Sequence, residues 1–272
     1  MSDRSDSLAS WRAFITDPTD AHAETLRRHL ASDVVVTIHT TNEKGADAAL
    51  STLKRSLFHT VVSGGHWEKP GSEGDIVTQM LSLPAKAIAA GFKFSFTFDG
   101  NDKLARIEGG WLLPPPALVP EPITLTAAMR ARLDDAEKDR MPVLFAYVTP
   151  DGRPEQMCRN GIHTRGDDQL AFWNPRPEGS FLASVAANPR VSAIYRHDHT
   201  HEMLELWGRA RLITDEEEAR QIYDARPDLV RRRDPDRNGV AVVIDLDRVT
   251  GLIHATETGA LERILMARHK TE

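Results

Sequence analysis

The sequence predicts an α+β protein of two domains, in which a cone-shaped α+β barrel precedes a small β-barrel. Helical segments followed by a long run of alternating strands over residues 8 to 113 indicate the cone, because such a sheet can curl around a pocket that the helices cap. Four extended segments with a short helix inserted among them, between Pro142 and Thr214, indicate the second barrel. A proline-rich stretch separates the two regions.

The proline-rich stretch, LLPPPALVPEPI, holds five of the sixteen prolines within residues 112 to 123. Proline lacks the amide hydrogen that helices and central strands need, and closely spaced prolines favour an extended, semi-rigid spacer. We therefore predict a first domain over residues 1–113, a linker over 114–123 and a second domain over 124–272.

Charge and cysteine content exclude several classes of protein. The formal net charge is −6, and no basic tail or face indicates a nucleic-acid partner. The first thirty residues contain no apolar run, so we expect neither a signal peptide nor a membrane span and place the protein in the cytoplasm. Cys158 is the only cysteine, which excludes an internal disulfide and a thiolate-rich metal site.

In the first domain, apolar spacing predicts helices over residues 8–15, 21–31 and 45–58, with Asp20 as the N-cap of the second. The alternation of Phe92, Phe94, Phe96 and Phe98 places these rings on one face of a strand, and DGND after it is a hairpin turn. The predicted strands are DVVVTIHT, HTVVSGGHWEK, DIVTQMLSLPAKA and the two arms of FKFSFTFDGNDKLARIEGGWLL.

Three segments of this domain, SDVVVTIHT, KGADAALSTL and FSFTFDGNDKLARIEGGW, resemble the SnoaL-like family within the nuclear transport factor 2-like fold. The resemblance covers most of residues 8 to 113. That fold hosts isomerases, cyclases, dehydratases and plain binding modules, so the resemblance implies a ligand cavity without naming a reaction.

Asp33 and His39 are the candidate catalytic residues of this cavity, and His59, His66 and Trp67 are further candidates to line it. A carboxylate beside an imidazole in an apolar pocket can abstract and return a proton, because desolvation raises the pKa of the carboxylate towards neutrality. The alternative is structural: Asp33 as the acceptor of a helix-to-strand turn, and the histidines at the rim or in the core. No closely spaced histidine pair occurs in this domain, so we expect no metal there.

The second domain begins with a helical stripe from Leu125 to Ala136, capped by Thr124 or Thr126. We expect next a three-stranded meander, a helix over residues 178–187 that Asn188-Pro189 ends, and the strand RVSAIYR. The strand EMLELWGRARLI is expected to bend at Gly208, and Thr214 with Glu217 forms a capping box for a helix over 215–224. VAVVIDLDRVTGLI is the last clear strand.

The segments VLFAYVTPDGRPEQMCRNGIH, LAFWN, NPRVSAIYR and LWGRARLITDEEEARQIY resemble the pyridoxamine 5′-phosphate oxidase-like family, the flavin-binding split barrel. The resemblance covers about residues 125 to 252, and its most specific part is NPRVS. It implies a split β-barrel that forms a homodimer, with a flavin bound in the groove between the subunits. The flavin is FMN in most of the family and the deazaflavin F420 in some branches.

The resemblance also implies cofactor-binding residues. The family's phosphate-binding arginine falls at Arg159, its lysine at Thr164 with Arg165 alongside, its threonine at Asn174 and its serine cluster at Ser180. In this family the cluster around the serine also carries a cationic side chain, which this sequence lacks. Arg176, in the loop just before, stands where it can replace that cation. The lost lysine contact would be worth about 1.5–3 kcal/mol. Trp173 is a candidate to stack on the flavin ring, with packing in the core as its alternative.

These observations leave three functions open. The first is an oxidoreductase that uses FMN or F420 and acts on a small organic molecule, with the first domain contributing substrate binding. The second is a cofactor-free binding or regulatory protein that uses the barrel as a dimer scaffold. The third is haem or metal binding by the alternating His197, His199 and His201, which read equally well as a polar hairpin loop. We expect the run 231–233, RRR, to be a loop neutralised by neighbouring aspartates.

Overall fold

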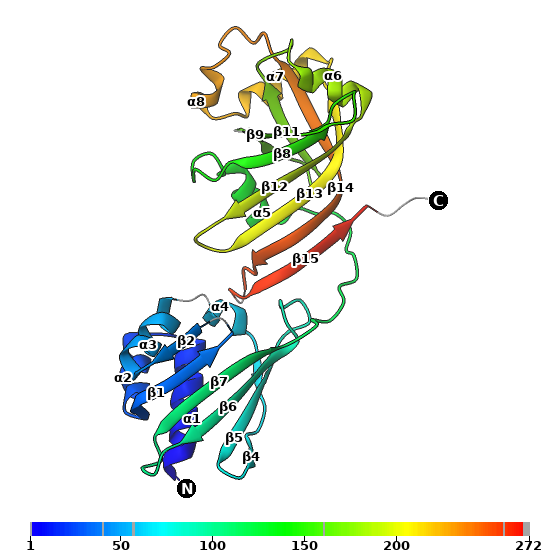
Figure 1. The fold of residues 1–272 in the computed structure, drawn as a ribbon. Coiled ribbons are helices and arrows are strands. Elements are labelled where there is room, and N and C mark those ends of the chain that lie inside the picture. The colour runs from blue at the N-terminus through cyan, green and yellow to red at the C-terminus, as the bar shows by residue number, and fades with distance from the viewer. Residues whose placement is uncertain (1, 40, 56–57, 160, 258, 269–272) are drawn as a thin grey trace. The chain divides into compact units, whose positions relative to one another are not determined.

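A computed structural model describes residues 2–39, 41–55, 58–159, 161–257 and 259–268, and its ribbon is drawn in Figure 1. The chain divides into two compact units. Unit 1 comprises Met1–Ala117 and His254–Glu262, and unit 2 comprises Leu118–Ile253 and Arg263–Glu272. The sheets and helices of both units make this a mixed α+β structure, as the sequence predicts.

Unit 1 contains a seven-stranded sheet of order β2-β1-β7-β6-β5-β3, with β4 paired to β5. β1 runs parallel to β7, and the other described pairs are antiparallel. The helices are α1 (Ser2–Thr16), α2 (Asp20–Arg27), α3 (Ala46–Arg55) and α4 (Phe58–Val62). The strands are β1 (Leu30–Ile38), β2 (Thr41–Lys44), β3 (His66–Trp67), β4 (Gly71–Glu73), β5 (Ile76–Ser82), β6 (Gly91–Phe98) and β7 (Leu104–Leu112).

The core of unit 1 contains a cluster of aromatic rings among aliphatic side chains. Phe92, Phe94 and Phe96 alternate along β6 and are fully buried, which confirms the predicted shared face, while Phe98 at the strand end is partly buried. Trp11 of α1 packs edge-on against Phe94, with ring centroids 5.8 Å apart. The apolar face of α1, which repeats every 3.6 residues, therefore packs on the apolar face of β6, which repeats every two residues.

Two predictions for unit 1 were wrong, one about a strand and one about the ends of a helix. Phe58–Val62 forms α4 and not a strand, because the helical spacing of Phe58 and Val62 turns both towards the core: the Phe58 ring lies 4.5 Å from Phe92, and Val62 is buried. The helix predicted to begin after Asp20 has Thr19 as its N-cap, whose hydroxyl accepts from the amide of His22, and it ends at Arg27. Leu57, part of the predicted helix over 45–58, lies outside the described residues.

Unit 2 contains an eight-stranded sheet of order β10-β11-β14-β13-β12-β8-β9, with β15 paired to β14. The helices are α5 (Ala127–Asp134), α6 (Ser180–Ala187), α7 (Glu216–Asp224) and α8 (Asp228–Arg231). The strands are β8 (Val143–Val148), β9 (Pro154–Arg159), β10 (His163–Arg165), β11 (Gln169–Asn174), β12 (Arg190–His197), β13 (Glu202–Leu212), β14 (Val240–His254) and β15 (Leu261–Ala267).

This sheet curls round a common core. β8 and β11 are separated by three other strands in the sheet order, which would place them roughly 19 Å apart in a flat sheet. Yet the rings of Phe145 in β8 and Phe172 in β11 have centroids only 5.7 Å apart. The structure is consistent with the predicted split-barrel fold for about half of the chain.

The predicted helix caps and the predicted bend at Gly208 in unit 2 are confirmed, with one change of N-cap residue. Thr126, one of the two predicted caps, accepts from the amide of Met129 at the start of α5. The N-cap of α7 is Asp215 and not Thr214, because the Asp215 carboxylate accepts from the Glu218 amide at 2.8 Å. The register between β13 and β14 shifts at Gly208, where a Cβ atom would lie 2.4 Å from the carbonyl oxygen of Asp245.

Candidate functional site

Unit 2 has a cavity of about 810 Å³ at the ends of β9 and β11 and the start of α6. Its charged lining residues are Arg159, Arg176 and Arg233. Within the described residues, no carboxylate lies at ion-pair distance from any of the three guanidinium groups. The other lining residues are Tyr147, Met157, Cys158, Asn174, Pro175, Gly179, Ser180 and Phe181. A cavity with three unneutralised cations is suited to an anion.

The N-terminus of α6 borders this cavity. Gly179 is the N-cap residue and supplies no side-chain hydrogen bond to the first turn, so amide groups there are open to a ligand. Asn174 at the end of β11 donates its side-chain amide to the carbonyl of Arg176 at 2.9 Å, which fixes the loop that leads into the helix. The helix dipole adds to the positive potential of the arginines.

Arg159 is the most enclosed of the three cations. Its guanidinium carbon lies 5.1 Å from the ring centroid of Phe172 and 4.9 Å from that of Phe181. Its Nε is buried and has no hydrogen-bond partner among the described residues. Burial lowers the pKa of Arg159, and the nearby Arg176 lowers it further. The guanidinium group stays charged at neutral pH, so it can bind an anion.

Tyr147 of β8 brings a hydroxyl to the same cavity. It donates to Oε2 of Glu155 at 2.6 Å, and its ring packs edge-on against Phe181 at 5.1 Å. Burial and the hydrogen bond to Glu155 raise the pKa of Tyr147, while a hydrogen bond with Ser180 opposes the shift. The hydroxyl therefore remains protonated and links Ser180 to the wall of the cavity.

Sequence reasoning missed Arg233 as a cavity residue because it treated residues 231–233 as one neutralised loop. The structure separates them: Arg231 pairs with Asp228 and also donates to the carbonyl of Asp224, whereas Arg233 lines the cavity. Arg231 and Arg232 line a separate groove, so members of one short run face two different sites. No signal in the sequence distinguishes Arg233 from its neighbours.

Four of the predicted cofactor-binding residues, Arg159, Asn174, Arg176 and Ser180, line the cavity, and two do not. Arg165 pairs with Glu218 of α7. Trp173 is buried on the opposite side of β11 from Phe172, where its Nε1 donates to Asp234 at 2.8 Å. Successive residues of a strand face opposite ways, so Trp173 cannot share the cavity with Asn174.

The family's lysine position, Thr164, is also occupied structurally. Its amide donates to Asp134 at 2.6 Å and its hydroxyl donates to the other carboxylate oxygen at 3.0 Å. This position therefore joins β10 to the end of α5 and contributes nothing to the cavity.

In unit 1 the structure does not bring the predicted catalytic pair into the core. Asp33 is exposed beside the irregularity in the pairing of β1 with β7, and His39 is exposed, with its ring 6.0 Å from that of Trp111. His66 is exposed as well, and Trp67 is half-buried against Phe94. The exposed residues are therefore not part of the buried core, and both their place in a cavity and their catalytic role stay predictions.

Other polar atoms of unit 1 are enclosed instead. The indole nitrogen of Trp11, Nδ1 of His59 and Oε1 of Gln79 are buried without a hydrogen-bond partner in the described part of the chain. Buried polar groups are normally paired, so these three atoms are the better candidates for contact with a ligand in this unit.

The histidine cluster forms a hairpin turn. His197 ends β12, Nδ1 of His197 lies 3.0 Å from the Thr200 hydroxyl, and His199 and His201 are exposed. Within the described ranges, no group of three or more histidine, cysteine, aspartate or glutamate residues is arranged to hold a metal ion. The segment is the hairpin turn that the loop interpretation predicts, and haem or metal binding by these histidines stays an untested alternative.

No family model matches the sequence, and no curated protein matches it. Among solved structures, an FMN-binding protein of Nostoc punctiforme related to pyridoxamine 5′-phosphate oxidase is 17% identical over 53% of this chain and 89% of its own, with a TM-score of 0.43. A putative pyridoxamine 5′-phosphate oxidase from Lactobacillus delbrueckii is 16% identical over 46% of this chain and 93% of its own, with a TM-score of 0.36.

A putative polyketide cyclase from Sinorhizobium meliloti is also similar, at 17% identity over 39% of this chain and 94% of its own, with a TM-score of 0.31. The neighbours related to pyridoxamine 5′-phosphate oxidase each cover about half of the chain. At TM-scores below 0.5, such likeness assigns neither a ligand nor a reaction. In the part of the chain that the structure describes, no helix is long and apolar enough to cross a membrane.

Proposed function

We propose that the cavity of unit 2 binds the phosphate of a flavin-type cofactor, FMN or alternatively F420, and that the protein is an oxidoreductase acting on a small organic molecule. The observation that carries this proposal is Arg159, an enclosed guanidinium that has no anionic partner among the described residues and lies beside Arg176 and the uncapped start of α6.

The residues present fit a phosphate group. Guanidinium groups form paired, charge-assisted hydrogen bonds with phosphate oxygens, and Arg159, Arg176 and Arg233 can approach from different sides. The first amides of α6 and the Ser180 hydroxyl supply further donors. Together they offset the desolvation of a dianion, which compensates for the lysine missing at Thr164.

A bound flavin would supply the hydride chemistry, and the chain would place it and exclude water. Phe181 and the ring of Tyr147 form an apolar wall beside the arginines. Arg159 is held over two aromatic rings, so its fork is fixed before the ligand arrives. Such preorganisation reduces the entropy that binding costs.

The competing function is a cofactor-free binding or regulatory protein that keeps the barrel as a dimer scaffold. Two observations favour it: Arg165 is neutralised by Glu218, and Trp173 faces away from the cavity. Both residues would then be parts of the scaffold. The two functions differ in whether the purified protein carries a flavin.

We also propose that unit 2 forms a homodimer through the outer face of β8, β12 and β13. Leu144 and Trp207 are 45% and 36% exposed there, beside a groove of about 210 Å³ that Ile194 also lines. Large apolar side chains grouped on a sheet face are typical of an interface. The second copy of the chain is the partner that the split barrel implies.

Leu144→Glu is expected to convert the dimer into a monomer, because the new carboxylate would be desolvated at the contact. The matched control is Ile76→Glu in unit 1, where an isoleucine with nearly the same exposure, 46%, receives the same charge. Light scattering during size-exclusion chromatography measures the mass of each. A wild-type monomer, or equal behaviour of the two variants, would refute this interface.

Unit 1, in this proposal, binds the organic substrate near Trp11, His59 and Gln79, because their buried polar atoms lack partners among the described residues. Replacing Gln79 with leucine would remove one of these atoms and is expected to lower the amount of substrate retained.

Purification from a host that makes FMN tests the flavin proposal. The protein is expected to be yellow, and denaturation is expected to release FMN or F420, identified by mass spectrometry together with any second molecule. A colourless preparation whose released fraction contains neither cofactor would favour the cofactor-free scaffold.

A further inference from the structure

The segment between α7 and β14, residues 225–239, carries α8 and brings Arg233 to the cavity. Most of its polar side chains are exposed, and Arg232 and Arg237 line a separate open groove with Asp224 and Asp228. An exposed segment of this length needs anchors if one of its residues is to keep a fixed position. Several hydrogen bonds that hold this segment in place converge on one buried residue.

Asp234 is that residue, with an exposed fraction of 6%. One carboxylate oxygen accepts from Nε1 of Trp173 and from the amide of Gly239, each at 2.8 Å, and the other accepts from the amide of Asn238 at 2.9 Å. Burial disfavours the charged form, but these hydrogen bonds outweigh it and lower the pKa of Asp234. The carboxylate therefore joins two parts of the loop to β11.

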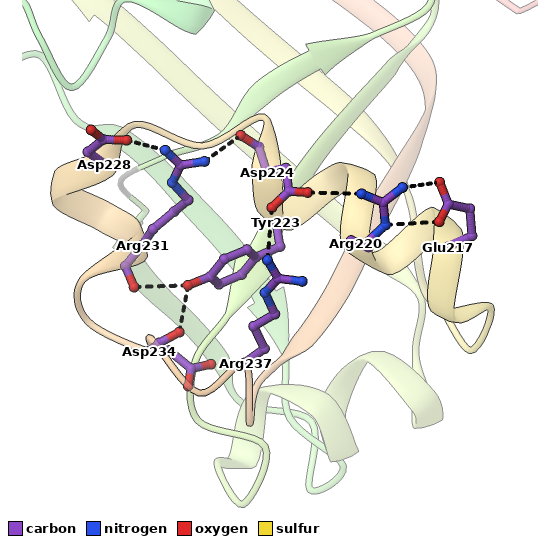
Figure 2. Close-up of polar contacts among 8 residues, drawn as sticks. All are labelled: Glu217, Arg220, Tyr223, Asp224, Asp228, Arg231, Asp234 and Arg237. Atoms are coloured by element: carbon purple, nitrogen blue, oxygen red, sulfur yellow. Dashed lines mark hydrogen bonds and ion pairs between the residues drawn. The ribbon is translucent and has the colours of Figure 1, made fainter.

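Tyr223, the penultimate residue of α7, binds the backbone of Asp234. Figure 2 shows its hydroxyl between the carbonyl oxygens of Asp234 and Arg231, at 2.8 and 3.1 Å. The Trp173 ring meets the Tyr223 ring edge-on at 5.1 Å. Two guanidinium carbons also lie over the Tyr223 ring, that of Arg237 at 4.8 Å and that of Arg226 at 5.7 Å from its centroid.

Both ends of this linkage are directly next to cavity residues. Trp173 precedes Asn174, and Asp234 follows Arg233. The approach is close: a Cβ atom on Gly239 would lie 2.3 Å from the carbonyl oxygen of Asn174 and 2.4 Å from Nε1 of Trp173. One buried hydrogen-bonded group thus holds the loop that carries Arg233 against β11, the strand that carries Asn174.

We infer that Asp234 is a positioning residue for the anion site, which holds Arg233 at the cavity by fastening the loop to Trp173. This inference deepens the proposed function and rests on it. Asp234 touches no ligand in this account, and its effect on binding passes entirely through Arg233 and the loop.

The sign of the effect distinguishes positioning from simple electrostatics. A carboxylate near an anion site repels the anion, so its removal by Asp234→Asn would tighten binding if charge alone mattered. Positioning gives the opposite result, because asparagine keeps one acceptor oxygen and replaces the other with an NH2 group, which then faces either the N–H of Asn238 or those of Trp173 and Gly239. Asp236→Asn is the matched control, since Asp236 is an exposed carboxylate in the same loop.

The experiment titrates the full-length protein and its variants with FMN, following the quenching of flavin fluorescence. We expect Asp234→Asn to weaken binding by about tenfold, the effect of losing one charge-assisted contact, and Asp236→Asn to leave it unchanged or slightly tighter. Arg233→Ala should weaken binding by a similar factor. In an Arg233→Ala background, Asp234→Asn should have no further effect.

Trypsin supplies a readout that needs no ligand. Cleavage after Arg231, the site of this run farthest from position 234, should become faster in Asp234→Asn and stay at the wild-type rate in Asp236→Asn, because the freed loop enters the protease more readily. Trp173→Phe removes the N–H donor and keeps a smaller aromatic ring, without changing the sequence of the loop. It should give a change of the same sign and is the variant to use if Asp234→Asn does not fold.

The outcomes separate the two claims. Wild-type protein that binds no FMN overturns the proposed cofactor site, and a loop then equally resistant to trypsin in both aspartate variants overturns the positioning role as well. Wild-type binding with equal affinities for Asp234→Asn and Asp236→Asn overturns the positioning role alone. Additive effects of Asp234→Asn and Arg233→Ala would also contradict it.

Discussion

Replacing Arg159 with methionine is expected to weaken FMN binding by one to two orders of magnitude. The variant removes a charge-assisted contact worth about 1.5–3 kcal/mol and keeps an apolar chain against Phe172 and Phe181. Stability should not fall with affinity, because the variant removes an enclosed charge that has no ionic partner in the described part of the chain. Fluorescence titration and thermal unfolding of the same preparations measure the two effects.

Arg165→Met is the matched control for this prediction. It removes the same charge from β10, but Arg165 pairs with Glu218 and does not line the cavity, so FMN affinity should change by less than about threefold. Arg159→Lys should fall between wild type and Arg159→Met, since lysine restores the charge without the planar fork. Equal losses for Arg159→Met and Arg165→Met would contradict the placement of the site.

Phe172→Ala is expected to cause the largest loss of stability, about 3–5 kcal/mol in the free energy of unfolding. The side chain is fully buried, and its ring lies 5.7 Å from Phe145 and 5.9 Å from Phe181. Truncation would leave a void that the surrounding strands fill only in part. Urea denaturation of the full chain, followed by circular dichroism, measures the change.

Val119→Ala provides the comparison for Phe172→Ala. Val119 is 83% exposed, so its truncation should change the free energy of unfolding by less than about 0.5 kcal/mol. A loss below 1 kcal/mol for Phe172→Ala would contradict the closed barrel, because Phe172 would then not be enclosed by strands from both ends of the sheet order.

Period and turn chemistry allowed most of the fold to be predicted. Alternation placed Phe92, Phe94 and Phe96 on the buried face of one strand, and the Asn188-Pro189 pair marked the end of α6. α4 was missed because its short apolar run, Phe58–Val62, fits a strand as well as a single helical turn. Only the packing of Phe58 on Phe92 decides between them.

The candidate site was predictable only in part. The family resemblance located Arg159, Asn174 and Ser180, which lie at strand ends and a helix start where short motifs fix the geometry. Trp173 was misplaced although the strand was correct, because a resemblance does not state which face of the strand turns to the cavity. Arg233 comes from a loop whose position depends on the buried Asp234, a tertiary contact with no local signal.

Charged residues were the least predictable part of the molecule. Arg165 and Arg233 both stand in polar segments near aspartates and glutamates. Arg165 pairs with Glu218, whereas Arg233 lines the cavity and has no ion pair among the described residues. Which carboxylate reaches which guanidinium is set by the path of α7 and the loop after it. That path follows from packing around Tyr223 and Trp173 and not from charge spacing along the chain.

Parallel titration of the full-length protein with FMN and with riboflavin tests the central claim most directly, because the two ligands differ only in the phosphate. We expect one FMN per chain, bound at least about a hundredfold more tightly than riboflavin, with the preference lost in Arg159→Met and reduced by salt. Equal affinities for FMN and riboflavin, or no uptake of FMN or F420 at all, would contradict a phosphate site formed by Arg159, Arg176 and Arg233.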